Sequence, residues 1–190
     1  METKDFTHVI TSENVSIGYI PGSSKVLFIK TGQDGTIYGY ENKYLDIAME
    51  VNEKYGHTVF VSATSSDSRE VYERDMQLLE HYLGTTDYEL FYFGVSKGGL
   101  IGLWYGANNR HVKRIASVNA PLMVNFYSKT LPSIKNLGRD KVTMVYGTLD
   151  PSYKYVPFVE KWAKVEIIDG ADHNLKDMTS SYVKIVEDML

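Results

Sequence analysis

From about residue 15 onward, short apolar runs rich in β-branched and aromatic residues alternate with longer segments of helical periodicity. The predicted strands are Val15–Ile20, Lys25–Lys30, His57–Ala63, Tyr88–Val95, Val112–Asn119, Lys141–Gly147 and Lys164–Ile168. The predicted helices are Tyr40–Lys54, Arg69–Leu83, Lys97–Asn108, Val156–Lys161 and Met178–Leu190. Such alternation is typical of an α/β fold with a mostly parallel central sheet and helices on both faces. In these folds ligands bind at the carboxyl ends of the strands, so the loops that follow the strands are the place to look for a site.

Two segments depart from this alternation. Val15–Ile20 and Lys25–Lys30 flank the turn-type sequence Pro21-Gly22-Ser23-Ser24, which predicts a β-hairpin at the beginning of the sheet. Pro121 to Gly138 is the least regular segment, because two prolines interrupt a mixture of large apolar residues, and we interpret it as a candidate small cap. No repeat or linker-type segment occurs, so we expect residues 1–190 to form a single domain.

The composition excludes several classes of function. With 190 residues, 43% of them hydrophobic, the chain can bury a real core. A formal net charge of −4 and the lack of any lysine- or arginine-rich run argue against nucleic acid as a partner. The absence of cysteine excludes disulfides, thiolate metal ligands and cysteine nucleophiles. The segment Met1–Asp5 has no leader character and no run of 18 apolar residues occurs, so we expect a cytoplasmic protein without a membrane span.

The sharpest motif is Gly94-Val95-Ser96-Lys97-Gly98, which matches G-x-S-x-G where a predicted strand meets a predicted helix. A serine on so tight a turn needs neighbours without side chains two positions away on either side, and Gly94 and Gly98 meet this need. The turn would expose the hydroxyl beside the first N–H groups of the helix, where an oxyanion could be stabilised. The alternative is a glycine-rich turn that packs a helix onto the sheet, with Ser96 as its cap. Nucleotide-binding patterns fit poorly, because Leu100 occupies the lysine position of a phosphate-binding loop and G-x-G-x-x-G is absent.

A serine nucleophile needs a base and an acid that orients the base, and in a sheet of this kind they follow in the order Ser, Asp, His. Asp150 follows the sixth predicted strand, and His173 lies between the last predicted strand and the last helix. Read alone, Asp150 before a proline is an ordinary turn residue. Asp169 and Asp172 are rival acids, but they are so close to His173 in sequence that a relaxed contact is harder to build. The remaining histidines are less well placed: His8, His57, His81 and His111.

The loop after the strand Lys25–Lys30 is the second place where an oxyanion could be bound. It reads Thr31-Gly32-Gln33-Asp34-Gly35, in which Gly32 lets the backbone approach a substrate. We expect the main-chain N–H groups of Gln33 and Lys97 to form an oxyanion hole, with Gly32 and Asp34 as substrate-binding residues. The same sequence is also a good plain turn, and its place directly after a predicted buried strand favours the functional interpretation.

Taken together, the Gly94–Gly98 motif, Asp150 in Gly-Thr-Leu-Asp-Pro and His173 in Gly-Ala-Asp-His resemble the corresponding segments of the α/β-hydrolase superfamily. The resemblance covers roughly residues 15 to 190. It implies an α/β-hydrolase fold, Ser96 as nucleophile, His173 as general base and Asp150 as the orienting acid. Thr31 departs from the histidine that many lipases and esterases have there. Lys97 after the nucleophile is also unusual, and its charged side chain could either favour an acidic substrate or leave Ser96 less exposed.

The resemblance implies a serine hydrolase that cleaves a small-molecule or glycan ester through an acyl-enzyme, without a metal or an organic cofactor. Because only residues 121–138 could form a lid, we expect an open site suited to small or extended acyl groups. Two alternatives stay open. The same triad could transfer the acyl group to a sugar hydroxyl, since Ser-Lys-Gly-Gly is similar to a segment of some bacterial glycan-modifying acyltransferase-like proteins. A non-catalytic binding protein could also be built on this scaffold.

Overall fold

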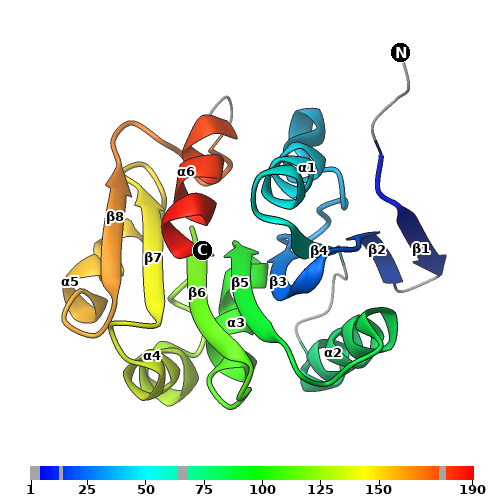
Figure 1. Ribbon diagram of the computed structural model, residues 1–190. Helices are drawn as coiled ribbons and strands as arrows, with labels where there is room; N and C mark the ends of the chain where they lie inside the picture. Colours follow the sequence, from blue (N-terminus) through cyan, green and yellow to red (C-terminus); the bar gives the residue numbers. More distant parts are fainter. Residues whose placement is uncertain (1–4, 13–14, 64–67, 176–178) are drawn as a thin grey trace.

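The computed structural model describes residues 5–12, 15–63, 68–175 and 179–190. Within these residues, eight strands form one sheet in the order β1-β2-β4-β3-β5-β6-β7-β8 (Figure 1). The strands are β1 (His8–Ser12), β2 (Val15–Ile20), β3 (Ser23–Lys30), β4 (His57–Ser62), β5 (Glu89–Val95), β6 (Val112–Val118), β7 (Val142–Gly147) and β8 (Lys164–Ile168). All pairs from β4 to β8 are parallel, and β2 is antiparallel to both of its neighbours. The predicted mostly parallel sheet is therefore confirmed.

Helices cover both faces of the sheet. They are α1 (Lys43–Tyr55), α2 (Arg69–Leu83), α3 (Lys97–Gly106), α4 (Leu131–Leu137), α5 (Val156–Val159) and α6 (Thr179–Met189), with single turns η1 (Tyr40–Asn42), η2 (Phe126–Thr130) and η3 (Tyr153–Tyr155). Helices α1 and α6 contribute to the core on one face, and α2 to α5 contribute to the core on the other. Side chains alternate between the two cores along each central strand, so Phe91 and Phe93 face α1 and α6 while Leu90 and Tyr92 face α3.

The predicted hairpin at the beginning of the sheet is wrong. β2 does not pair with β3, because β4 lies between them, and β2 pairs instead with β4 and with β1. The Pro21–Gly22 link passes across the amino end of β4, where the N–H of Gly22 donates to Thr58 Oγ1. A Cβ at Gly22 would lie 2.5 Å from the main chain of His57, so a glycine is needed for this close crossing. β1 lies outside the predicted strands, because the side chains of this edge strand are mostly exposed.

Residues 121–138, predicted as a small cap, contain η2 and α4. A hydrogen bond joins this segment to α3, because Trp104 Nε1 donates to Thr130 Oγ1 at 2.9 Å. The predicted start of the last helix at Met178 lies outside the described residues, and α6 is described from Thr179. Within the described residues no helix combines the length and apolar character that crossing a membrane requires.

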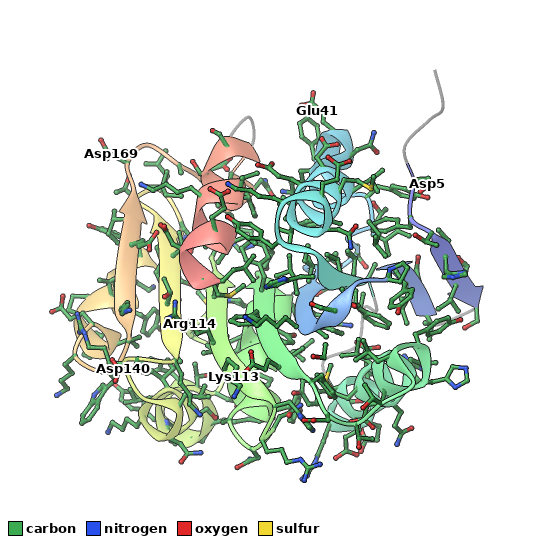
Figure 2. The ribbon with its side chains drawn as sticks, viewed as in Figure 1. Asp5, Glu41, Lys113, Arg114, Asp140 and Asp169 are labelled. Atoms are coloured by element: carbon green, nitrogen blue, oxygen red, sulfur yellow. The ribbon has the colours of Figure 1, made fainter. Side chains whose placement is uncertain are left out.

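The strand register brings the loops of one sheet edge together. Lys30 pairs with Gly94 and Val95 pairs with Val118, so the loops after β3, β5 and β6 are neighbours. In Figure 2, Asp169 after β8 lies at the upper side of the view with Glu41, whereas Asp140 before β7 lies at the lower side. The upper side is thus the carboxyl edge of the sheet. Figure 1 shows α4 at the opposite, lower side.

Candidate active site

Ser96 occupies a sharp turn between β5 and α3. Its φ of 52° and ψ of −120° lie outside the regions that residues with side chains ordinarily adopt. The turn is tight enough that a Cβ on Gly94 would lie 2.5 Å from the carbonyl oxygen of Gly98, and a Cβ on Gly98 would lie 2.3 Å from that of Lys30. The two glycines therefore let the helix start directly over the strand ends. The strained backbone leaves Ser96 half-buried at the carboxyl edge.

His173 lies between Ser96 and Asp150. Ser96 Oγ is 2.9 Å from His173 Nε2, and His173 Nδ1 is 2.5 Å from Asp150 Oδ2. The Asp150 side chain is fully shielded, whereas 41% of the His173 side chain is exposed. The hydrogen bond to Asp150 raises the pKa of His173 above its ordinary value. Burial opposes this change, and the charges of Asp150 and Asp172 reinforce it.

The acid loop and the histidine loop are tied to each other. The N–H of Leu149 donates to the carbonyl of Ala171 at 2.9 Å, and a Cβ on Gly147 would lie 2.2 Å from the same oxygen. Asp150 Oδ1 accepts the N–H of Ser152 at 2.6 Å, which fixes the second carboxylate oxygen. These contacts hold the carboxylate in the orientation that its hydrogen bond to the histidine ring needs.

Asn119, predicted only as the last residue of a strand, contacts the loops that carry the acid and the histidine. Its fully buried side chain donates to the carbonyls of Asp172 at 3.0 Å and His173 at 2.9 Å, and it accepts the N–H of Gly147 at 3.0 Å. It therefore joins the loops after β6, β7 and β8. In the sequence, the available signal was an asparagine at the end of an apolar strand. In the structure this asparagine has a φ of 48°, a conformation that asparagine adopts more readily than most residues.

The loop after β3 lies against the serine turn. A Cβ on Gly32 would lie 3.2 Å from Ser96 Cβ, so the glycine permits the approach. The next residue is Gln33, whose main-chain N–H has no hydrogen-bond acceptor among the described residues. Lys97 is the first residue of α3, so its main-chain N–H lies at the positive end of that helix. Asp172, a rival acid in the sequence, instead accepts the N–H groups of Asn174 and Leu175 in a turn.

Ser96 and His173 open onto a cleft of about 510 Å³. Its lining includes Gly32 and Asp34, which were predicted to bind substrate, and Gln33, which was predicted to bind the oxyanion. The turn before α1 and the first residues of that helix also line it. Neither Lys97 nor any residue of the 121–138 segment is part of its lining. The lining also includes Lys43, a cationic residue that no sequence motif pointed to. Within the described part of the chain, no three His, Asp or Glu side chains gather closely enough to hold a metal ion.

No protein-family model matches this sequence, and no curated protein matches it either. Solved structures do. Est1E from Butyrivibrio proteoclasticus is 14% identical, with a TM-score of 0.67 over 95% of this chain and 96% of that one. XC6422 from Xanthomonas campestris, described as an α/β serine hydrolase without lid, is 16% identical, with a TM-score of 0.63 over 97% of this chain and 95% of that one.

The dienelactone hydrolase from Anabaena variabilis is also similar. It is 16% identical, with a TM-score of 0.67 over 97% of this chain and 95% of that one. At these identities the likeness concerns the path of the backbone, and it extends over nearly the whole length of both chains in each pair. The protein therefore has the α/β-hydrolase fold, as the resemblance of its sequence motifs predicts.

Proposed function

We propose that this protein is a serine hydrolase that cleaves carboxylic esters through an acyl-enzyme. The observation that supports this most directly is the continuous hydrogen-bonded series Ser96, His173, Asp150 facing the cleft. A hydroxyl near neutral pH is a poor nucleophile unless a neighbouring base takes its proton, and His173 Nε2 is within reach of that proton. Asp150 holds the ring in the tautomer whose Nε2 is free to accept, and its charge stabilises the imidazolium that forms.

The reaction has two halves that use the same groups. In acylation, His173 Nε2 takes the proton of Ser96 Oγ, which attacks the ester carbonyl, and the imidazolium then gives this proton to the departing alcohol. In deacylation, His173 takes a proton from water, hydroxide attacks the acyl-serine carbonyl, and Ser96 Oγ leaves with that proton. Each half passes through a tetrahedral oxyanion. The main-chain N–H groups of Gln33 and Lys97 stabilise it in this proposal.

The substrate is a small or extended ester. A cleft of about 510 Å³ with no contribution from residues 121–138 supports an open site rather than one covered by a lid. The similar structures include an α/β serine hydrolase without lid and a dienelactone hydrolase, and hydrolysis of an ester by this protein would agree with both.

Turnover of 4-nitrophenyl esters, from acetyl to long acyl chains, tests this proposal. We expect the wild type to hydrolyse the short esters and Ser96→Ala to lose at least about 10⁴-fold in kcat. Ser128→Ala, which changes an exposed serine in η2, is the matched control and should behave as the wild type. A fluorophosphonate probe should label the wild type and Ser128→Ala but not Ser96→Ala.

Other outcomes would lead to other functions. Hydrolysis restricted to long-chain esters would contradict the open site. A faster release of nitrophenol on addition of a sugar, without more free acid, would indicate that the acyl group goes to a hydroxyl acceptor. A folded wild type that neither turns over any ester nor reacts with the fluorophosphonate would show that Ser96 is not activated, and the proposal would be abandoned for a binding function.

A further inference from the structure

Lys43, the first residue of α1, is a buried cation in the wall of the cleft. Only 9% of the residue is exposed, although it lines the same cavity as Ser96 and His173. Its Nζ lies 4.4 Å from the centre of the Tyr182 ring and donates to Tyr182 Oη at 3.4 Å. No carboxylate pairs with it among the described residues. The contrast with Lys30 is clear, because that buried lysine forms an ion pair with Asp75 at 2.9 Å.

A buried ammonium group without a carboxylate is costly, and lysine is rarely so buried without a partner. The face of an aromatic ring offsets only part of the lost hydration. Burial accordingly lowers the pKa of Lys43 below its ordinary value. An anion in the cleft would supply the missing countercharge, and the α1 N-terminus, where Lys43 lies, adds positive potential of its own.

The turn that leads into α1 is held in an uncommon conformation. Gly39, Glu41 and Asn42 have φ values of 72°, 50° and 62°, and two of these three residues carry side chains. Such strain persists where the surrounding structure requires it, often at ligand sites. Here it brings Gly39, Tyr40 and Lys43 to the cleft. Glu41 itself is exposed at the upper rim (Figure 2) and does not line the cleft, so it does not neutralise Lys43.

We propose that Lys43 binds a carboxylate carried by the substrate, so that the preferred esters are monoanions. This inference rests on the ester hydrolysis proposed for Ser96. A single ammonium group matches a single negative charge. Among the described residues that line the cleft, the other acidic or basic side chains are those of Asp34, which is exposed, and His173. Asp34 would repel a dianion such as a phosphate monoester more than a carboxylate, which favours the carboxylate.

Matched ester pairs test the proposal. The anionic series is the mono-4-nitrophenyl esters of glutaric, adipic and pimelic acids, and the neutral series is the 4-nitrophenyl esters of pentanoic, hexanoic and heptanoic acids. The quantity measured is the ratio of kcat/KM for each anionic ester to that of its neutral partner, after subtraction of the rate without protein. For the wild type we expect a ratio of at least about 10 at one chain length, mainly through a lower KM.

Lys43→Met and Lys43→Gln should reduce this ratio at least about tenfold, and Lys43→Arg should retain part of it because it keeps the charge. Lys54→Met is the matched control, since it removes an exposed lysine from the other end of the same helix, and its ratio should equal that of the wild type. Should Lys43→Met fail to fold, Lys43→Gln against Lys43→Arg gives the same comparison. A wild-type ratio near 1 at every chain length, or a ratio unchanged by Lys43→Gln, would overturn the proposal.

A binding experiment tests this proposal separately from the hydrolysis on which it rests. Calorimetry with monomethyl adipate is done on Ser96→Ala and on Ser96→Ala combined with Lys43→Gln. We expect binding to the first protein and at least tenfold weaker binding to the second. If no ester is turned over in a Ser96-dependent manner, the hydrolase function fails and this comparison still decides the carboxylate site. Equal binding by both proteins, or binding by neither, counts against Lys43 as an anion site.

Discussion

The ring of His173 meets a buried carboxylate at one nitrogen and an accessible hydroxyl at the other. Only the neutral ring can accept the proton of Ser96, and the hydrogen bond to Asp150 raises the pKa of His173 above 6.5. Raising this pKa moves the acid limb of activity to higher pH. We therefore expect kcat/KM for a neutral 4-nitrophenyl ester to rise with pH, with a midpoint above 6.5.

Asp150→Asn tests the origin of this midpoint. Removing the carboxylate should lower the midpoint and reduce kcat by about 10⁴-fold, because the amide stabilises the wrong tautomer. The measurement is a pH profile of kcat/KM for both proteins. A wild-type midpoint below 6.5, or a variant with the same midpoint as the wild type, would contradict the assigned role of Asp150.

Asn119 acts on His173 through the main chain, as a positioning residue. Asn119→Gly keeps the positive φ accessible but removes the donors to the carbonyls of Asp172 and His173. We expect the free energy of unfolding to fall by about 1–3 kcal/mol and kcat/KM to fall by about 10- to 100-fold. The pH midpoint should also move down, because the looser loop weakens the bond to Asp150. A less stable protein with an unchanged midpoint would show a purely structural role.

At the scale of elements, strands with long apolar runs were predictable and their pairing at the beginning of the sheet was not. β5, β6 and β7 lie close to their predicted ranges because strands buried on both faces have largely continuous apolar sequences. The order of β2, β3 and β4 depends on the crossing at Gly22, which local sequence does not encode. The order of the motifs along the chain was enough to propose Ser96, Asp150 and His173. The roles of Asn119 and Lys43 could not be predicted, because they depend on contacts with residues distant in sequence.

A buried ion pair joins three of these elements. Lys30 on β3 binds Asp75 on α2 and Ser62 on β4, each at 2.9 Å. Burial lowers the pKa of Lys30, and Asp75 opposes this change. Asp75→Leu should destabilise the protein by about 3–5 kcal/mol because it leaves a buried charge, whereas the double variant with Lys30→Met should be near neutral or more stable. Urea denaturation measures the free energy of unfolding of both variants, and an equal decrease in the two would contradict this prediction.

For the whole molecule, the position of Lys43 predicts an opposition between stability and activity. Replacing its ammonium group with an apolar side chain removes the cost of a buried charge that pairs with no carboxylate among the described residues. Lys43→Met should therefore raise the free energy of unfolding by about 1 kcal/mol and Tm by about 2–4 °C. Lys54→Met, which breaks only an exposed pair with Glu187, should change Tm little. Thermal denaturation checks this, and a lower Tm for Lys43→Met than for Lys54→Met would show that Lys43 stabilises the fold.

The place of β4 between β2 and β3 has a consequence for the order in which the chain assembles. β1 and β2 can pair as soon as both have left the ribosome. Neither β2 nor β3 can pair with β4 until residues 57–62 have been made. β3 also waits for β5, its other neighbour. Long-range pairing of this kind slows folding. The sheet should thus nucleate at β3, β4 and β5, with the amino-terminal pair of strands joining its edge afterwards.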